Sequence, residues 1–312
     1  MAPDPSWPAD VPPGSSPSAE PNTVCVDDDD DDIPRLSADT LALLQDFQQS
    51  QSARLAAFQQ LQSRAAARFD ALGDTDEGDE QPAAEDEDVS QDDNDPLANM
   101  EVFTEDWNLS QFWYTDLTAR TLTAFALDPL VKVPLALDSA PRANPNFEKL
   151  PDINIAILSA PTVHQYLTRC VLPLLPRPVR QKVHAVLFEH DSRFSVFGPK
   201  QFVHYDFNAP TRIPESAKAR FDVVIVDPPF LSAECQIKTA MTVRLLLSPD
   251  QDRRKIVVCT GQKVGDVILR TYRPYGVRCT EFRPEHRNGL QNEFRCFASR
   301  ELDDIWKFEQ DE

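Results

Sequence analysis

Five short apolar runs recur along the chain from about residue 150 onward. They have four to six residues, as in INIAIL, FDVVIV and KIVVC, and are apolar on both faces. Strands that are buried inside a parallel sheet have this composition. Longer segments that could form helices or loops separate the runs, so this region predicts an α/β fold. The runs are Ile153–Leu158, His184–Phe188, Phe202–Tyr205, Phe221–Val226 and Lys255–Cys259.

Two further runs near the C-terminus have a different pattern. Polar and apolar residues alternate in Val277–Phe282 and Glu293–Ala298, which is typical of strands with one exposed face. The loop between them is too short for a parallel crossover, so they should pair as an antiparallel hairpin at one edge of the sheet. The seven runs together predict a parallel sheet that ends in an antiparallel hairpin.

The first hundred residues follow another pattern, in which one helical stretch lies between two acidic segments. Residues 36–72 contain no Pro or Gly and place apolar residues at helical spacing, so we expect one long helix. Its length favours either a coiled-coil-like arm or a helix that is docked on the following domain. We expect residues 1–35 to be a disordered acidic tail, 73–100 an acidic linker and 101–312 the α/β domain.

Charge divides the chain at the same boundary. The first hundred residues carry 24 Asp and Glu against four Arg, which accounts for the whole net charge of −20. The rest of the chain is formally neutral and lacks the basic surplus that neutralises phosphates in most nucleic-acid-binding proteins. Nucleic acid is therefore not the expected partner, and the acidic region could instead attract a basic one.

The six cysteines are widely spaced and form no CxxC pair, so we expect reduced thiols and no metal site. The N-terminus has neither a basic nor an apolar signal region, and no apolar stretch reaches the roughly 20 residues that span a bilayer. These features predict a soluble intracellular protein without a membrane partner.

Acids or prolines follow each of the first four predicted strands. In an open α/β sheet, ligands bind beyond the carboxyl ends of the strands, near the point where strand order reverses. Glu189, after the second strand, could accept both ribose hydroxyls of a nucleoside cofactor, and Asp206, after the third, could accept its adenine amino group. One such acid alone could equally solvate a loop or cap a helix. We predict cofactor contacts from Ser159, Ala160, Pro161, Glu189, Asp191, Asp206, Phe207 and Asp227.

The sharpest signal is the tetrapeptide Asp227-Pro228-Pro229-Phe230 after the fourth strand. Its two prolines fix the backbone and leave carbonyl oxygens free as acceptors, because a prolyl residue has no N–H to donate. An amine could be held between the Asp227 carboxylate and the Pro228 carbonyl, with Phe230 packed against the substrate. The alternative is a rigid turn without a chemical role. We predict that these four residues are catalytic.

Several longer segments carry a family resemblance, in the same order along the chain. They are SQFWYTDLTARTL at 110–122, LFEHDSRFSVFG at 187–198, FVHYDFN at 202–208, FDVVIVDPPFLSAEC at 221–235, KIVVCTG at 255–261 and NEFRCFASR at 292–300. They resemble the eukaryotic N6-adenine-methyltransferase-like family of elongation factor 1A lysine methyltransferases. The tetrapeptide is similar to the signature of methyltransferases that act on amino groups, and PRLSADTLALLQDF near Pro34 resembles the N-terminal helix of the family.

The resemblance implies a class I, Rossmann-like methyltransferase domain with a seven-stranded sheet over residues 101–312. It also implies transfer of one to three methyl groups from S-adenosyl-L-methionine to a lysine of translation elongation factor 1A in the cytoplasm. Asp227 to Phe230 would be the catalytic motif. Tyr114 and Thr115 resemble a motif that contacts the cofactor, and Trp113 would line the same pocket on the substrate side, with Phe230.

The segment SAPTV at residues 159–163 departs from the wider superfamily, because many Rossmann-like methyltransferases have a glycine-rich loop after the first strand. Contacts to the cofactor at this point must therefore use a different backbone path. The resembled family shares this departure, so the family resemblance is not weakened by it.

Two other functions are weighed against lysine methylation. Methylation of adenine N6 in DNA or RNA uses the same amine geometry, but it would require an extruded base and a basic groove. A catalytically inactive adaptor could use the helix and the acidic tails alone. The neutral C-terminal charge disfavours the first alternative, and the intact tetrapeptide disfavours the second.

Overall fold

A computed structural model describes residues 38–73, 103, 105, 111–303 and 305–310 of the chain. The chain divides into two compact units, Met1–Gln48 and Gln49–Glu312, and the α/β domain lies within the second. The predicted tail at 1–35 and the predicted linker at 73–100, apart from Gly73, lie outside the described residues. No described helix has both the length and the apolar character needed to cross a bilayer.

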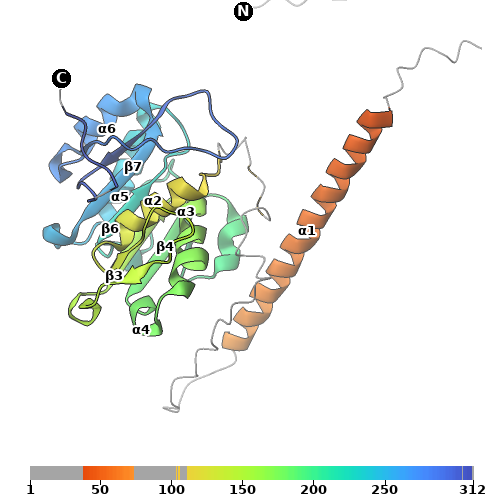
Figure 1. Cartoon of the computed structure of the whole chain (residues 1–312), viewed down its shortest axis with the longest axis horizontal. Coiled ribbons are helices and arrows are strands. Elements are labelled where there is room, and N and C mark those ends of the chain that lie inside the picture. Colours follow the sequence, from red (N-terminus) through yellow and green to blue (C-terminus); the bar gives the residue numbers. More distant parts are fainter. Residues whose placement is uncertain (1–37, 74–102, 104, 106–110, 304, 311–312) are drawn as a thin grey trace, which may run out of the picture. The chain divides into compact units, whose positions relative to one another are not determined.

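The N-terminal helix, α1, extends over Ala38–Gly73 and has 36 residues (Figure 1). The prediction of one long helix at 36–72 is thus confirmed, and the absence of Pro and Gly before Gly73 explains its continuity. Within the larger unit, Leu61 is buried, and the ring of Phe58 lies 6.0 Å from that of Phe103 in an edge-on contact. These contacts agree with the docked alternative for this stretch of the helix.

Seven strands form one sheet in the order β5-β4-β3-β6-β7-β9-β8. Neighbours from β5 to β7 are parallel, whereas β9 is antiparallel to both β7 and β8. The α/β prediction and the antiparallel C-terminal pair are therefore confirmed, with β9 inserted between β7 and β8. The strands are β3 Ile153–Leu158, β4 Val183–Glu189, β5 Phe202–His204, β6 Val223–Val226, β7 Lys255–Gly261, β8 Arg278–Cys279 and β9 Phe294–Ala298. A separate pair, β1 Val131–Lys132 and β2 Arg142–Ala143, is not predicted from the sequence.

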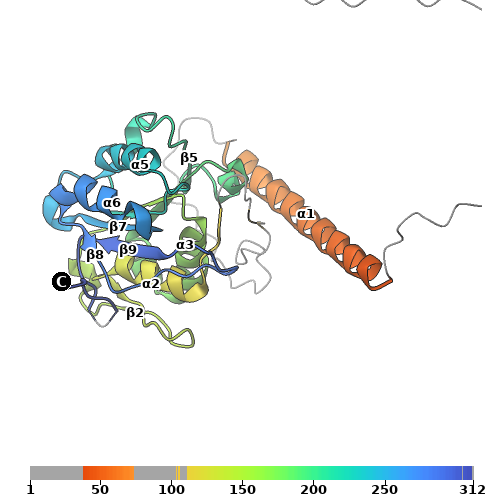
Figure 2. The same ribbon diagram turned by 90° about the horizontal axis from the view of Figure 1, so that it is seen from above.

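Helices cover both faces of the sheet (Figure 2). They are α2 Asp116–Leu127, α3 Pro161–Gln165, α4 Arg177–Arg180, α5 Ala233–Leu246 and α6 Gly265–Thr271. A π-helical stretch, Tyr166–Val171, continues α3, and short 3-10 turns occupy Phe147–Lys149, Leu172–Leu174, Ser192–Phe197, Glu215–Ala217, Gln251–Arg253, Gln262–Val264 and Arg273–Tyr275. The sheet is thus the middle layer of three, as its apolar strands predict.

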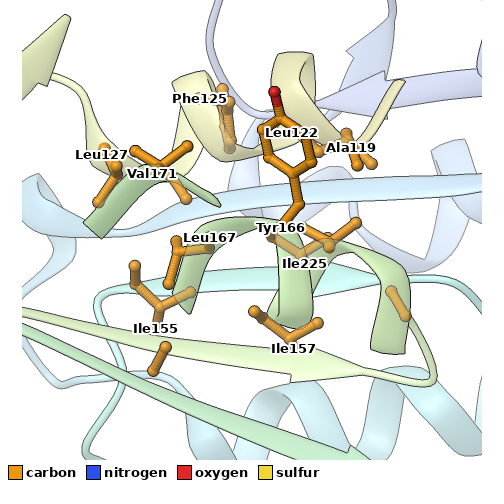
Figure 3. Packing of buried hydrophobic residues seen from close by; sticks show 14 of the residues in the cluster. Ala119, Leu122, Phe125, Leu127, Ile155, Ile157, Tyr166, Leu167, Val171 and Ile225 are labelled. Carbon is orange, nitrogen blue, oxygen red and sulfur yellow. The ribbon is translucent and has the colours of Figure 1, made fainter. Parts of the chain in front are cut away.

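The side chains of β3 divide the core between the two faces. Ile155 and Ile157 belong to the cluster that includes α2 and the α3 region, whereas Ala156 and Leu158 belong to the cluster with α5 and α6. Figure 3 shows the first cluster, in which Leu122 from α2 and Leu167 pack beside the β3 isoleucines. Each fully buried Leu or Ile stabilises the fold by about 1.5–3 kcal/mol. This alternation explains why the run INIAIL is apolar on both faces, apart from the half-buried Asn154.

Strand order reverses at β3, which has β4 on one side and β6 on the other. Parallel strands end at the same edge of the sheet, so the segments that follow β3, β4, β5 and β6 converge there. These are the segments that contain most of the predicted site residues.

Lys255, the first residue of β7, has a buried amine that contacts the end of α2, and burial lowers its pKa to about 7. Its Nζ donates to the carbonyl oxygens of Phe125 at 2.5 Å and Ala126 at 3.1 Å, and also to that of Asp128. The last carbonyls of a helix have no partner within the helix and carry partial negative charge. Lys255 therefore satisfies three buried acceptors and fixes the position of α2 on the sheet.

Replacing Lys255 with Met should lower the free energy of unfolding by about 2–4 kcal/mol, because the carbonyls that end α2 would lose their donor while the side chain keeps its length. Urea denaturation followed by circular dichroism would measure the change. The control Lys307→Met removes an exposed lysine and should shift stability by less than about 0.5 kcal/mol. Equal stability of both variants would show that the contacts of Lys255 contribute little.

Candidate active site

A pocket of about 560 Å³ opens at the carboxyl ends of the parallel strands, a volume typical of small-molecule sites. Its walls come from the ends of β3 to β6, the segment before α2 and the loop before β9. The structure brings most of the predicted residues together there. Those that line the pocket are Trp113, Tyr114, Ser159, Ala160, Pro161, Glu189, Asp206, Phe207, Asp227, Pro228, Pro229 and Phe230.

The turn after β3 replaces the usual glycine with a strained serine. Ser159 adopts a φ of 55°, in the left-handed region, and its N–H donates to the carbonyl of Phe188 at 2.9 Å. Pro161 then begins α3, where a missing N–H has no consequence. A left-handed conformation at a residue other than glycine costs about 1 kcal/mol and is often found at functional sites. The segment SAPTV thus makes a sharp turn without glycine.

Glu189, the last residue of β4, is buried at the pocket wall with 5% of its surface exposed. Its Oε1 accepts the N–H groups of His190 at 2.9 Å and Asp191 at 3.2 Å. Burial raises the pKa of Glu189 to about 7, although these backbone donors oppose the shift. The carboxyl group is therefore held rigidly where the sequence predicts a partner for ribose hydroxyls.

Two predicted cofactor residues, Thr115 and Asp191, lie outside the pocket lining. Thr115 is the N-cap of α2 and accepts the N–H of Thr118 at 3.3 Å. Asp191 accepts hydrogen bonds from Gln111 at 3.1 Å and from the Arg193 Nε at 2.7 Å. These hydrogen bonds fix the walls beside the pocket, and direct cofactor contact by the two residues stays a prediction.

Asp206 and Phe207 occupy the turn after β5. The Oδ1 of Asp206 accepts the N–H of Asn208 at 2.8 Å, which closes the turn and holds the carboxylate at the pocket wall. The ring of Phe207 lies 5.5 Å from that of Phe230 in the tetrapeptide Asp227–Phe230. The predicted cofactor and substrate segments therefore meet across the pocket.

Asp227 lies at the centre of the site, directly after β6. Its N–H donates to the carbonyl of Leu158 at 3.0 Å, which joins the tetrapeptide to the end of β3. Burial raises the pKa of the Asp227 carboxyl to about 8; the nearby Tyr114 hydroxyl opposes this rise, and the charge of Glu189 adds to it. The buried Tyr114 hydroxyl makes no hydrogen bond of ordinary geometry with any described residue. The hydroxyl is therefore a buried polar group that faces the Asp227 carboxyl.

Trp113 lines the pocket from the segment before α2. Its Nε1 donates to the carbonyl of Phe103 at 2.9 Å, and its ring meets that of Phe194 edge-on at 6.2 Å. Only 5% of its surface is exposed, although it still lines the pocket. The predicted place beside the pocket agrees with the structure, while direct substrate contact stays a prediction.

Several lining residues are not predicted from the sequence. His286 pairs with Tyr114 in an antiparallel bridge, and the N–H of Thr115 donates to the carbonyl of Glu285 at 2.9 Å. Strand-end reasoning misses those that lie ahead of the sheet or between His286 and Phe294. The others, such as His190 and Leu231, directly adjoin predicted residues at the strand ends. The resembling segments SQFWYT and NEFRCFASR include part of the first group but not His286. The missed residues are Gln111, Phe112, Thr162, His190, Tyr205, Asn208, Leu231, His286, Leu290, Gln291, Asn292 and Phe294.

The pocket contains acids but no strongly basic side chains. Its described lining residues include the carboxyl groups of Glu189, Asp206 and Asp227, and they include no Lys or Arg. Buried carboxylates without a positive partner are unfavourable until a cation binds beside them. The site therefore favours positively charged ligands over phosphates.

Residues 105–302 match the family described as probable N6-adenine methyltransferase. The chain is 36% identical to a Caenorhabditis elegans protein-lysine N-methyltransferase, over 87% of this chain and 96% of that protein. It is 33% identical to the Saccharomyces cerevisiae protein-lysine N-methyltransferase EFM5, over 88% and 94%, and 31% identical to human EEF1A lysine methyltransferase 1, over 87% and 94%.

Replacing Asp227 with Asn should stabilise the ligand-free protein more at pH 9 than at pH 5. The pKa of Asp227 is about 8 in the folded chain against an ordinary value of 3.8, so the folded state binds more protons between these values. The Asp227 carboxyl thus lowers the free energy of unfolding as pH rises from about 4 to about 8. The amide of the variant does not titrate and has no such effect. We expect the gain of the variant to grow by about 1–3 kcal/mol from pH 5 to pH 9 in urea denaturation.

The comparison variant Glu189→Gln should show the same sign with a lower midpoint, because the pKa of Glu189 is about 7. A stability difference between the Asp227→Asn variant and the original protein that stays constant from pH 5 to pH 9 would contradict the buried, uncompensated state of this carboxyl.

Proposed function

The chain belongs to the family described as probable N6-adenine methyltransferase, and we propose that it methylates a lysine of translation elongation factor 1A with S-adenosyl-L-methionine as the methyl donor. The names of its relatives support the reaction, because they are protein-lysine N-methyltransferases and EEF1A lysine methyltransferases. The single observation that carries the proposal is the tetrapeptide Asp227–Phe230 at the centre of a pocket that is lined by carboxyl groups and by no described Lys or Arg.

The residues present fit the cofactor. Glu189, fixed by two backbone N–H groups, is suited to accept ribose hydroxyls, and Asp206 is suited to accept an adenine amino group. The acidic pocket suits a positively charged sulfonium. When bound, S-adenosyl-L-methionine would supply an electrophilic methyl group on that sulfonium.

The tetrapeptide can orient an amine through two acceptors. The carboxylate of Asp227 and the carbonyl of Pro228 can each accept an N–H group, which directs the remaining lone pair of the nitrogen into the pocket. Pro229 adds no competing N–H, and Phe230, with 41% of its surface exposed, is available to pack against the incoming side chain. Catalysis by these residues would consist mainly of positioning.

The substrate amine must be neutral before it can accept a methyl group. For a lysine with a pKa near 10.4, deprotonation at pH 7 costs about 4–5 kcal/mol. Burial and a nearby sulfonium would reduce this cost, and the proton would pass to water before transfer. None of the described lining residues is assigned as a dedicated base.

Adenine N6 in nucleic acid is the second candidate, because the matched family is described by that activity. It would use the same two acceptors at Asp227 and Pro228. The described lining offers no Lys or Arg for the flanking phosphates, which favours the lysine substrate. An elongation factor substrate also makes the cytoplasm the proposed site of action.

The proposal is tested by radiolabelled methyl transfer from S-adenosyl-L-methionine to purified elongation factor 1A, with DNA and RNA that contain adenine in parallel. We expect label on the protein alone. Asp227→Ala should reduce transfer at least about 100-fold while the cofactor still binds, because the amine loses its orienting acceptor. Asp206→Ala should weaken cofactor binding in calorimetry.

Asp266→Ala removes an exposed carboxylate in the first turn of α6 and is the matched control, expected to keep normal turnover. Label on nucleic acid would favour the second candidate. Near-normal turnover by Asp227→Ala would overturn the role of the tetrapeptide.

A further inference from the structure

Strand order divides the pocket into two halves. The ends of β3, β4 and β5 supply Ser159, Glu189 and Asp206, the residues suited to a nucleoside. On the other side of β6, the wall comes from the segment before α2 and from the loop that leads into β9. Asp227 follows β6 and therefore lies at the boundary. The second half, formed by the segment before α2 and the loop before β9, is therefore available to the substrate.

Four rings form the wall of this second half. The imidazole of His286 lies at its centre, 4.8 Å from the ring of Tyr114, 4.6 Å from that of Phe294 and 6.5 Å from that of Phe112. The bridge between Tyr114 and His286 fixes the two backbones, and the N–H of Arg287 donates to the carbonyl of Trp113 at 2.8 Å. The arrangement is thus held by main-chain hydrogen bonds and not by ring packing alone.

The His286 ring is neutral at physiological pH. Burial lowers its pKa to about 4, and its side chain forms no hydrogen bond or ion pair with another described residue. It therefore contributes a ring surface to the wall without the positive charge that would repel a cation.

From this juxtaposition we propose that Phe112, Tyr114, His286 and Phe294 form the channel for the side chain of the substrate lysine, and that His286 determines how many methyl groups the amine can receive. The proposal rests on lysine methylation as the function of the pocket. It assigns the control of product specificity to a residue of the loop before β9, a segment separate from the tetrapeptide Asp227–Phe230.

The chemistry of successive methylation explains why rings are needed there. The four methylene groups of a lysine match an apolar wall, and its nitrogen can reach the acceptors of Asp227 and Pro228. Each added methyl group removes one N–H, so a dimethylated amine gains less from these acceptors. A methylated ammonium is instead stabilised by the faces of aromatic rings. The His286 cluster would supply this stabilisation as the hydrogen bonds are lost.

The test uses full-length protein and elongation factor 1A that carries none, one or two methyl groups at the target lysine. His286→Ala should lower kcat/KM for the dimethylated substrate by about tenfold and for the unmethylated one by less than about threefold. Mass spectrometry should show products that stop at lower methylation. The dissociation constant of S-adenosyl-L-methionine should stay within about twofold, which also confirms folding.

His286→Phe keeps a neutral ring and should retain the product distribution of the original protein. His184→Ala is the control for loss of an imidazole elsewhere, because His184 lies on β4 and pairs with Asp152. Equal effects of His286→Ala on all three substrates, or a loss of cofactor binding, would overturn the role of His286.

A second measurement does not depend on the protein substrate. In protein loaded with S-adenosylhomocysteine, titration with trimethyllysine amide should shift the imidazole proton signals of His286 saturably in NMR spectra, and His286→Ala should bind the probe at least about fivefold more weakly by other pocket signals. Absence of any shift would overturn the channel. A clear shift in a protein that labels no lysine would instead overturn the proposed function while retaining the cation site.

Discussion

Two carboxyl groups, those of Glu189 and Asp227, are buried on either side of the end of β3 without a described Lys or Arg in the pocket they share. Such an arrangement is unfavourable by itself, because each group loses water and the two charges repel. It persists because the sheet fixes both strands and because main-chain N–H groups hold Glu189. A positively charged ligand would offset this cost. The burial of the two carboxyl groups therefore destabilises the free protein but favours binding of such a ligand in one orientation.

The elements around these carboxyls are built to keep them in place. Thr115 caps α2, and Lys255 holds the other end of that helix through the carbonyls of its last turn. Tyr114 immediately before α2 is thereby positioned beside Asp227, and its bridge to His286 brings in the loop that precedes β9. Segments from both ends of the domain therefore meet at one pocket, although no local interaction joins them in the sequence.

Under the proposed function, the two halves of the pocket would hold the two reactants of methyl transfer to an amine. Acids at the ends of β4 and β5 suit a nucleoside with a positively charged sulfonium, and neutral rings suit an apolar side chain that ends in an amine. The matched family is described by adenine methylation, whereas the pocket lining and the names of the relatives favour lysine as the substrate. In the proposed function both reactions share an amine held at Asp227, and the surrounding walls would decide which molecule presents it.

The sequence alone determined the α/β class, the parallel strands and the antiparallel C-terminal pair, because each depends on local apolar patterns and loop length. It also located Glu189, Asp206 and Asp227, since parallel strands end at one edge of a sheet. Only the tertiary structure decided that Gln111 binds Asp191 and that His286 joins the site. These outcomes depend on pairing between segments far apart in the chain, and no periodicity within either segment encodes such a contact.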